Sequence, residues 1–420
     1  MRGWRVPTGA AWLLAGLLAA AAPQAAAQSG APEPPATAPT PDLYQEALLS
    51  IAEGRKNDAS ATLSRLVDQE PLHAGAWLEL ALIQCSLGHA DEAERLFAAI
   101  ESRFQPPPGI IELITQARRN GCARWDANAV FSFSLARGID QNANQGSSSP
   151  TYTIAPGGVP TEYPLAADFL PKHDQYTQIS GDYLRDISAN GSTMFAQFQA
   201  RRNDRLSQYS SASLFAGVDT PWRFGKWTAR TSATAGLITL GGQLYQRQVQ
   251  VQARVGAPIP LPGNTQFSVL TGITHVDYVT LSNFDANTGE LRGMLNYRAE
   301  HGSARASFAV LDDRARGDRP GGNRHGISAN LSLRHSLGTL LSGELGVSKQ
   351  TWRSASLYAP NVIDVARRQD TVVLSASVSY PVTRNQAVQL EARQVKNREN
   401  ISIFQYNDRQ LQLSWQWQGP

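Results

Sequence analysis

Residues 127–417 carry one recurring pattern, a strict alternation of apolar and polar side chains over long segments. The pattern is clearest in residues 248–255 (QVQVQARV), 327–334 (ISANLSLR) and 410–417 (QLQLSWQW). Such alternation predicts a β-strand with one apolar face and one hydrated face. The alternating segments run to about 10 residues or more, which is the span of a tilted transmembrane strand, whereas strands of water-soluble domains average about five or six.

Fourteen such segments are predicted, an even number, as closure of a barrel with both ends on one side requires. Their connections alternate between short ones (188–191, 301–302, 336–338) and long ones (138–174, 279–289, 313–322, 351–368, 397–405), as in outer-membrane barrels. A two-sheet sandwich, the alternative, would not sort its turns in this way. Residues 125–418 are therefore predicted to form an antiparallel outer-membrane β-barrel of about 14 strands, at 127–137, 175–187, 192–203, 208–218, 226–238, 243–256, 264–278, 290–300, 303–312, 323–334, 338–350, 369–380, 385–396 and 406–417.

The alternation also predicts which side chains face lipid and which face the lumen. On the last strand an apolar stripe should face lipid, with the strand paired to the first one, 127–137; the stripe consists of Leu411, Leu413, Trp415 and Trp417. The charged side chains of the opposite face should line the lumen: Arg230, Arg254, Arg298, Arg334, Glu344, Glu391 and Arg393. Paired Arg and Glu can form a solvated, cross-linked wall or a selective path for a substrate, and both readings stay open.

The N-terminal residues predict export. Arg2 and Arg5 precede an apolar run, and Ala25 to Ala27 supply small residues for cleavage, which is the order of a secretory signal peptide at residues 1–27. The alternative, a membrane anchor, would need about 20 apolar residues, and this run is shorter. Residues 28–41 are rich in Pro and Ala and predict a disordered linker.

Residues 42–122 predict a helical domain that contains a repeat. The sequence matches itself at the spacing of Leu43 and Trp77, about 34 residues, which is the spacing of tetratricopeptide helix pairs. Two repeats are followed by a capping helix at 109–120. Such helix pairs either bind peptides and proteins or serve as spacers, and the candidate partner-binding residues are Leu43, Ala47, Trp77, Leu80, Ala81 and Gln84. Cys85 and Cys122 can form a disulfide in an exported protein or remain two separate buried thiols.

No enzyme is predicted. Nucleotide, zinc-protease, serine-hydrolase and paired-cysteine motifs are all missing from the sequence, and no cofactor or metal site is predicted. His275 and Asp277 fall on one face of a strand, where a surface histidine is the more common interpretation than a catalytic one. Asp140, Asn142 and Asn144 are interpreted as turn formers rather than cation ligands. The formal net charge is only +3, and it includes Arg2 and Arg5 of the predicted signal peptide. A chain this close to neutral has no basic field for nucleic acid.

The order of parts (signal, short tetratricopeptide stack, barrel of about 14 strands) resembles the surface lipoprotein assembly modulator (Slam) family of outer-membrane translocators, also grouped as type XI secretion. The resemblance runs from Asp42 to Trp417. Its local matches are WLELALIQCSLGHADEAERLFAAIE in the second repeat, GIDQNAN after the first strand and NISIFQYNDRQLQLSWQW at the end. The intervening strands match in pattern. The chain departs from the family pattern in its short helical domain and in its Trp-rich rather than Phe-terminated end.

The resemblance implies a function. The barrel would move a lipoprotein, or a small secreted haem- or metal-scavenging protein, from the periplasm to the cell surface. Its partners would be outer-membrane lipid, the client protein, the barrel assembly machinery and periplasmic chaperones. The N-terminal domain would lie in the periplasm and the barrel in the outer membrane. The sequence leaves three alternatives open: a porin, a polysaccharide-export barrel with a periplasmic tetratricopeptide domain, and an adhesin that uses its long loops.

Overall fold

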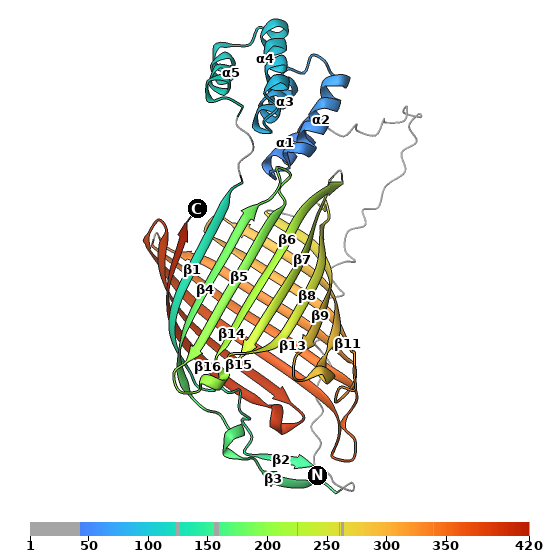
Figure 1. The fold of residues 1–420 in the computed structure, drawn as a ribbon, viewed down its shortest axis with the longest axis vertical. Coiled ribbons are helices and arrows are strands. Elements are labelled where there is room, and N and C mark those ends of the chain that lie inside the picture. Colours follow the sequence, from blue (N-terminus) through green and yellow to red (C-terminus); the bar gives the residue numbers. More distant parts are fainter. Residues whose placement is uncertain are drawn as a thin grey trace, which may run out of the picture. The chain divides into compact units, whose positions relative to one another are not determined.

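The computed structural model describes residues 43–122, 127–154, 159–224, 226–259, 261, 264–338 and 340–419. The predicted signal peptide and linker lie outside these residues. The described part of the chain consists of five α-helices followed by an antiparallel β-barrel (Figure 1). The predicted fold class is therefore confirmed. No helix among the described residues combines the length and apolar character needed to cross a membrane.

The helices form two antiparallel pairs and a final single helix: α1 (Leu43–Ala52), α2 (Lys56–Gln69), α3 (Ala74–Ser86), α4 (Ala90–Phe104) and α5 (Pro108–Asn120). Positions that the repeat makes equivalent have the same environment. The small residues Ala47, Ala59, Ala81 and Ala93 are all 0% exposed at the helix contacts. Gly54 and Gly88, which end α1 and α3, both adopt a positive φ, of 76° and 83°, a conformation that glycine reaches without steric cost. The two helix pairs therefore repeat in structure as well as in sequence.

Helix α5 is attached to the second pair by three kinds of contact. Ile114 is fully buried in the common core. Arg118 donates hydrogen bonds to Glu94 and Glu101 of α4, which raise the pKa of its guanidinium above the ordinary value. Cys85 of α3 forms a disulfide with Cys122, with the two Cα atoms 4.4 Å apart. The sequence left this disulfide open, and the structure forms it.

Fourteen of the described strands form one closed barrel, in which every consecutive pair is antiparallel and β1 pairs with β16. Closure leaves no strand edge, so every backbone N–H and C=O in the wall can find a partner without water. The barrel strands are β1 (Ala129–Asp140), β4 (Asp174–Asp186), β5 (Thr193–Asn203), β6 (Ser211–Phe224), β7 (Trp227–Leu240), β8 (Gln243–Gly256), β9 (Thr265–Tyr278), β10 (Ala286–Ala299), β11 (Gly302–Ala315), β12 (Arg324–Leu337), β13 (Leu341–Ala359), β14 (Ile363–Thr383), β15 (Gln386–Glu399) and β16 (Tyr406–Gly419).

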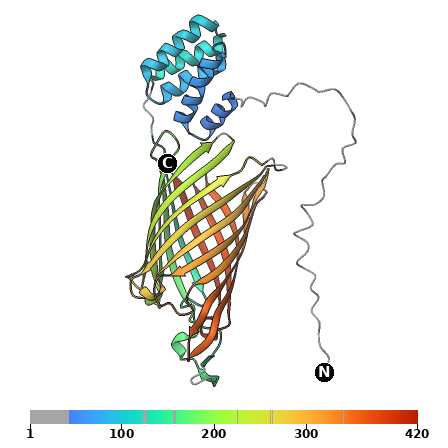
Figure 2. The same cartoon turned by 90° about the vertical axis from the view of Figure 1, so that its right-hand side faces the viewer.

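The outer face of the barrel is apolar. Every second residue of each strand points outward, and the register aligns these residues across neighbouring strands. Many of them are large hydrophobic side chains, among them Leu214, Val251, Ile273, Val310, Leu345 and Leu413, each 48–64% exposed. In water so large an exposed apolar surface would be unfavourable, whereas in a bilayer it is the required exterior. Figure 2 shows the tilted strands of this wall from a second direction.

The connections differ from the prediction in three places. We call the end that carries the connections 141–173, 279–285, 316–323 and 400–405 the loop end, and the opposite end the turn end. The predicted loop 351–368 is wrong, because β13 and β14 continue as a hairpin that leaves only 360–362 between them. The connection 241–242, also at the loop end, has only two residues, so short and long connections do not alternate strictly. Within the predicted loop 138–174 the structure forms a hairpin of β2 (Thr151–Ile154) and β3 (Thr161–Pro164).

Candidate functional site: the barrel lumen and its closing seam

The pairing register places all seven predicted lumen residues on the inward face. Arg230 and Arg254 are direct partners on β7 and β8, and Arg334 of β12 faces Glu344 of β13. Arg230 also donates to Asp219, with Nε 2.8 Å from Oδ1. Much of the remaining inward surface is amide-bearing, above all Gln246, Gln248, Gln250 and Gln252 along β8. The wall therefore offers many uncharged hydrogen-bond donors and acceptors between its charged groups.

The closing seam is formed by β1 and β16. The predicted outward stripe pairs as expected, with Leu411 opposite Ile139, Leu413 opposite Arg137, and Trp415 opposite Leu135. Towards the turn end the seam is flanked on its outer side by two aromatic pairs, Phe131 with Trp417 and Phe133 with Trp415, with ring centroids 6.0 and 6.2 Å apart. Amphipathic rings of this kind favour the headgroup layer.

Across the seam, on the lumen side, seven residues are joined by hydrogen bonds and one cation–π contact into a set that we call the seam network: Asp140, Tyr176, Arg201, Glu391, Asp408, Gln410 and Gln412. The Cζ atom of Arg201 lies over the ring of Tyr176, which is 1% exposed, at 3.8 Å from the ring centroid. The Tyr176 hydroxyl donates to Gln412, which donates in turn to Glu391, both at 3.0 Å. Asp140, 3% exposed, accepts from Arg201 and Gln410. Gln410 also donates to Asp408 at 2.6 Å.

Glycine 138 makes this arrangement sterically possible. A Cβ atom at Gly138 would lie 2.5 Å from the ring carbon Cζ of Tyr176, closer than any real contact. Only a glycine on β1 lets the tyrosine ring lie against the strand and reach Gln412 on β16. Gly138 belongs to the segment GIDQNAN, so this part of the segment has a packing role.

The loops above the seam continue the same contacts. Asn142, 2% exposed, accepts from the Gly146 N–H and donates to the carbonyl oxygens of Gly146 and Asn407, both at 2.9 Å. The Asn142 N–H donates to Asp140 at 2.8 Å. The side chain of Ser147 donates to the Ser402 carbonyl. Asp140 and Asn142 thus act as turn formers, and the amide of Asn142 is fully used by backbone groups. At the outer edge of the loop, the hydrogen bond from Lys172 lowers the pKa of Asp168.

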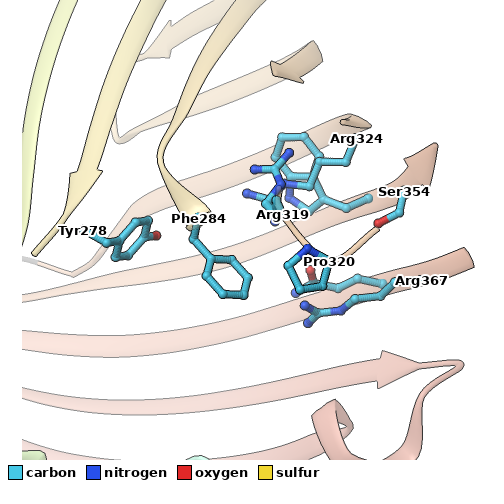
Figure 3. A pocket seen from close by; sticks show the side chains of 9 residues that line it. Tyr278, Phe284, Arg319, Pro320, Arg324, Ser354 and Arg367 are labelled. Carbon is cyan, nitrogen blue, oxygen red and sulfur yellow. The ribbon is translucent and has the colours of Figure 1, made fainter. Parts of the chain in front are cut away.

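A second lumen feature lies at the loop end, where three arginines converge on a small cavity of about 90 Å³ (Figure 3). Arg319 and Arg324 both bind Asp313, whose side chain is 0% exposed. Arg367 makes a bidentate pair with Glu399 at 2.7 and 3.0 Å, and Glu399 is equally buried. Three guanidinium groups thus share two carboxylates. Half of the remaining lining residues are aromatic: Tyr278, Phe284 and Trp352.

The predicted partner-binding residues of the helical domain separate into two groups. Ala47, Leu80 and Ala81 are 0%, 5% and 0% exposed, so they pack the core and cannot contact a partner directly; that part of the prediction is wrong. Leu43 is half-buried against the core. Trp77 is also half-buried, with its indole N–H bonded to the Pro71 carbonyl and Arg103 5.3 Å above its ring. Gln84 bonds to Ser60 and His89. Trp77 and Gln84 are the members best placed to meet a partner.

His275 and Asp277 point outward, as Val249 and Ile273 beside them do. His275 bonds to Asn287 at 2.7 Å and to Asp277 at 3.1 Å, and Arg316 donates to both His275 and Asp277. In the described part of the chain no serine hydroxyl is bonded to His275. The cluster is a network of surface charges near the loop end.

Sequence reasoning missed Tyr176, Arg201 and the arginines at 319, 324 and 367. Alternation gives the face on which each of these lies, but not which inward residues of distant strands meet. The available signal was indirect: Asp140 and Gly138 fall in a motif that is unusually rich in turn-forming residues for the end of a strand.

These features define the class of the protein: an outer-membrane-type β-barrel with an apolar exterior and a polar lumen, preceded by a domain of five helices. No protein-family model and no curated protein sequence matches the chain. Among solved structures, an anion-selective porin from Comamonas acidovorans matches with 8% identity and a TM-score of 0.38, over 70% of this chain and 100% of the porin.

A FadL homologue from Pseudomonas aeruginosa matches with 8% identity and a TM-score of 0.38, over 69% of this chain and 90% of the homologue. CdiB from Acinetobacter baumannii matches with 9% identity and a TM-score of 0.39, over 69% of this chain and 60% of CdiB. At TM-scores below 0.5 these matches assign neither a family nor a function.

Proposed function

We propose that this protein is an outer-membrane translocator that moves lipoproteins or small secreted haem- or metal-scavenging proteins from the periplasm to the cell surface, in the manner of the Slam family. The observation that carries the proposal is the joining, in one chain, of a disulfide-closed helical repeat domain to a closed barrel with an amide-rich lumen. A solute channel has no need of the first part. A translocator uses it to bind its client before passage.

The contacts at the seam support the family resemblance. GIDQNAN and NISIFQYNDRQLQLSWQW are far apart in sequence, yet Asn142 of the first binds the Asn407 carbonyl of the second, and Ile139 pairs with Leu411. Two of the three matching segments therefore form one structural unit, the seam and the loops above it. The third matching segment forms α3 and α4.

The lumen wall suits a passing polypeptide. An extended chain carries a donor and an acceptor at almost every residue and needs partners that do not depend on its side chains. The glutamines of β8 and β16 supply such partners, with no charge that would select one client sequence over another. Because the sequence contains no ATP-binding motif, folding of the client outside would supply the direction.

The proposed orientation follows from the signal peptide. Export delivers the helical domain to the periplasm, the turn end lies on that side, and the loop end faces outside. An epitope inserted in the connection 360–362 should be bound by antibody on intact cells. An epitope in the connection 105–107, between α4 and α5, should be bound only after permeabilisation. The reverse staining pattern would contradict the orientation.

The experiment for the function is co-expression with a candidate client, any small exported or lipidated protein that is encoded beside this chain. Protease added to intact cells should digest that client only when the full-length chain is present. A chain with Leu413→Arg, which should fail to assemble, is the matched control. Equal protection of the client with and without the chain would rule out the proposed function for that client.

The second candidate is a channel for small anionic solutes. It is favoured by the cavity at the loop end, where Arg319, Arg324 and Arg367 exceed the two carboxylates that they bind. This reading predicts ion conductance with preference for anions, and a weaker preference in Arg319→Gln.

A further inference from the structure

The outer face of β13 to β16 carries a patch of basic side chains at the loop end, which we call the outer basic patch: Lys349, Arg353, Arg368, Lys396, Arg398 and Arg409. Their outward direction follows from the register, because each shares its strand face with exposed apolar residues such as Val347, Leu374, Leu390 and Leu411. Asp370, an acidic residue on this face, pairs with Lys349 at 3.2 Å and stands opposite Arg398 of β15.

The other five side chains have no hydrogen bond or ion pair with any described residue. Arg353 and Arg368 even stand directly opposite each other on β13 and β14. Like charges in this position repel each other. Elsewhere at the loop end, three arginines have carboxylate partners: Arg137 pairs with Asp204, Arg314 with Asp312 and Arg316 with Asp277. The outer basic patch is therefore a local excess of positive charge that the protein itself does not neutralise.

Its position gives the chemistry of the missing partner. The patch begins where the apolar wall ends, since Arg409 is one outward step from Leu411 and Arg368 is three outward steps from Leu374 along their strands. A ligand that fits both surfaces has acyl chains against the apolar wall and an anionic group above them. Arginine clusters bind phosphate through several charge-assisted hydrogen bonds at once.

We infer that the outer basic patch binds the phosphate groups of the phosphorylated glycolipid, lipid A, that forms the outer leaflet. The leaflet assignment rests on the orientation proposed above, and the binding itself does not. A phosphate between Arg353 and Arg368 turns their repulsion into attraction, and Lys396, Arg398 and Arg409 extend the contact to a second phosphate. Bound lipid would then fix the strands on one side of the closing seam.

The test uses the full-length chain in detergent and fluorescent lipid A that carries both phosphates. Arg353→Gln/Arg368→Gln and Lys396→Gln/Arg398→Gln should each bind the probe more weakly, by about fivefold for each charge removed. The matched control is Arg334→Gln/Arg393→Gln, which removes two positive charges from the inward faces of β12 and β15; its affinity should equal that of the wild type. Heat-modifiable migration on gels verifies that each variant is a folded barrel.

Two further arms use the wild-type chain, so the test stands even if a variant fails to fold. Dephosphorylated lipid A should bind at least tenfold more weakly than the diphosphorylated form. Phosphatidylglycerol, whose phosphate is singly charged, should also bind more weakly. Equal binding of phosphorylated and dephosphorylated lipid A, equal binding of phosphatidylglycerol, or an equal loss in the inward control would overturn the inference. None of these outcomes depends on transport of a client.

Discussion

Asp140 is the residue on which the seam network depends most. It is 3% exposed and accepts from Arg201, whose side chain is itself only 18% exposed. Asp140→Asn would keep the shape and remove the charge, so Arg201 would be left without a carboxylate. We expect the free energy of unfolding to fall by about 1.5–3 kcal/mol, the range for a hydrogen bond to a charged group. This loss of stability is measured as a lower temperature at which the folded band disappears on gels.

Asp219→Asn is the matched control, because Asp219 also pairs with an arginine in the lumen. Its partner Arg230 is 44% exposed, so water replaces the lost contact. The expected loss is under about 1 kcal/mol. An equal loss in both variants would show that burial of the seam network contributes nothing to stability.

Leu413 and Gln412 are neighbours on β16 with opposite surroundings. Leu413 is 55% exposed on the outer face, whereas Gln412 is held in the lumen by Tyr176 and Glu391. An arginine on the lipid side costs about 2–4 kcal/mol at mid-depth. Leu413→Arg should therefore deplete the barrel from membranes, as seen by immunoblot of the membrane fraction. Gln412→Arg, which places the charge beside Glu391, should assemble. Depletion of both variants to the same degree would contradict the assigned faces.

At the scale of elements, helix α5 depends on the disulfide between Cys85 and Cys122, which joins residues 37 apart in sequence. A loop of this size gives an expected stabilisation of about 3–4 kcal/mol from restriction of the unfolded chain. Cys85→Ser/Cys122→Ser should lower the unfolding temperature of the helical domain, followed by circular dichroism of its helical signal, and leave the barrel transition unchanged. Unchanged helical melting would mean that Ile114 and Arg118 alone fix α5.

The elements were predictable wherever burial or lipid imposes a period. Alternation located all fourteen barrel strands, and the repeat located α1 to α4. Each of these elements has an apolar environment on one side only, so its apolar residues recur with a fixed period. The same reasoning explains the errors. Residues 351–368 lie beyond the apolar wall, where lipid no longer imposes an apolar outer face, so β13 and β14 continue without alternation. The β2–β3 hairpin lacks the pattern for the same reason.

The site was less predictable than the elements. Hydrogen bonds join Asp140 to Gln410, and Asn142 to Asn407, across the seam where the barrel closes. Local sequence fixes the face of each residue, but the register between the first and last strands decides which residues meet. The disulfide has the same character, since the approach of Cys122 to Cys85 depends on how α5 packs.

In the whole molecule, the proposed function makes the helical domain necessary for transport and unnecessary for assembly of the barrel. The barrel closes on its own strands, from β1 to β16. The helical domain has its own core, built around residues such as Leu63, Phe97 and Ile114. Removal of residues 42–122 takes away both cysteines together and leaves no unpaired thiol.

The most direct measurement is surface display of the neighbouring client in a strain that carries this deletion, with barrel abundance and uptake of small anionic solutes followed in the same cells. If the protein is a translocator, barrel abundance and solute uptake should be normal, and the client should stay protected from external protease. The contrary result is that the deletion strain displays as much client as the full-length chain, while solute uptake is lost only when the barrel is absent. That result would contradict the translocator function and favour the channel for small anionic solutes.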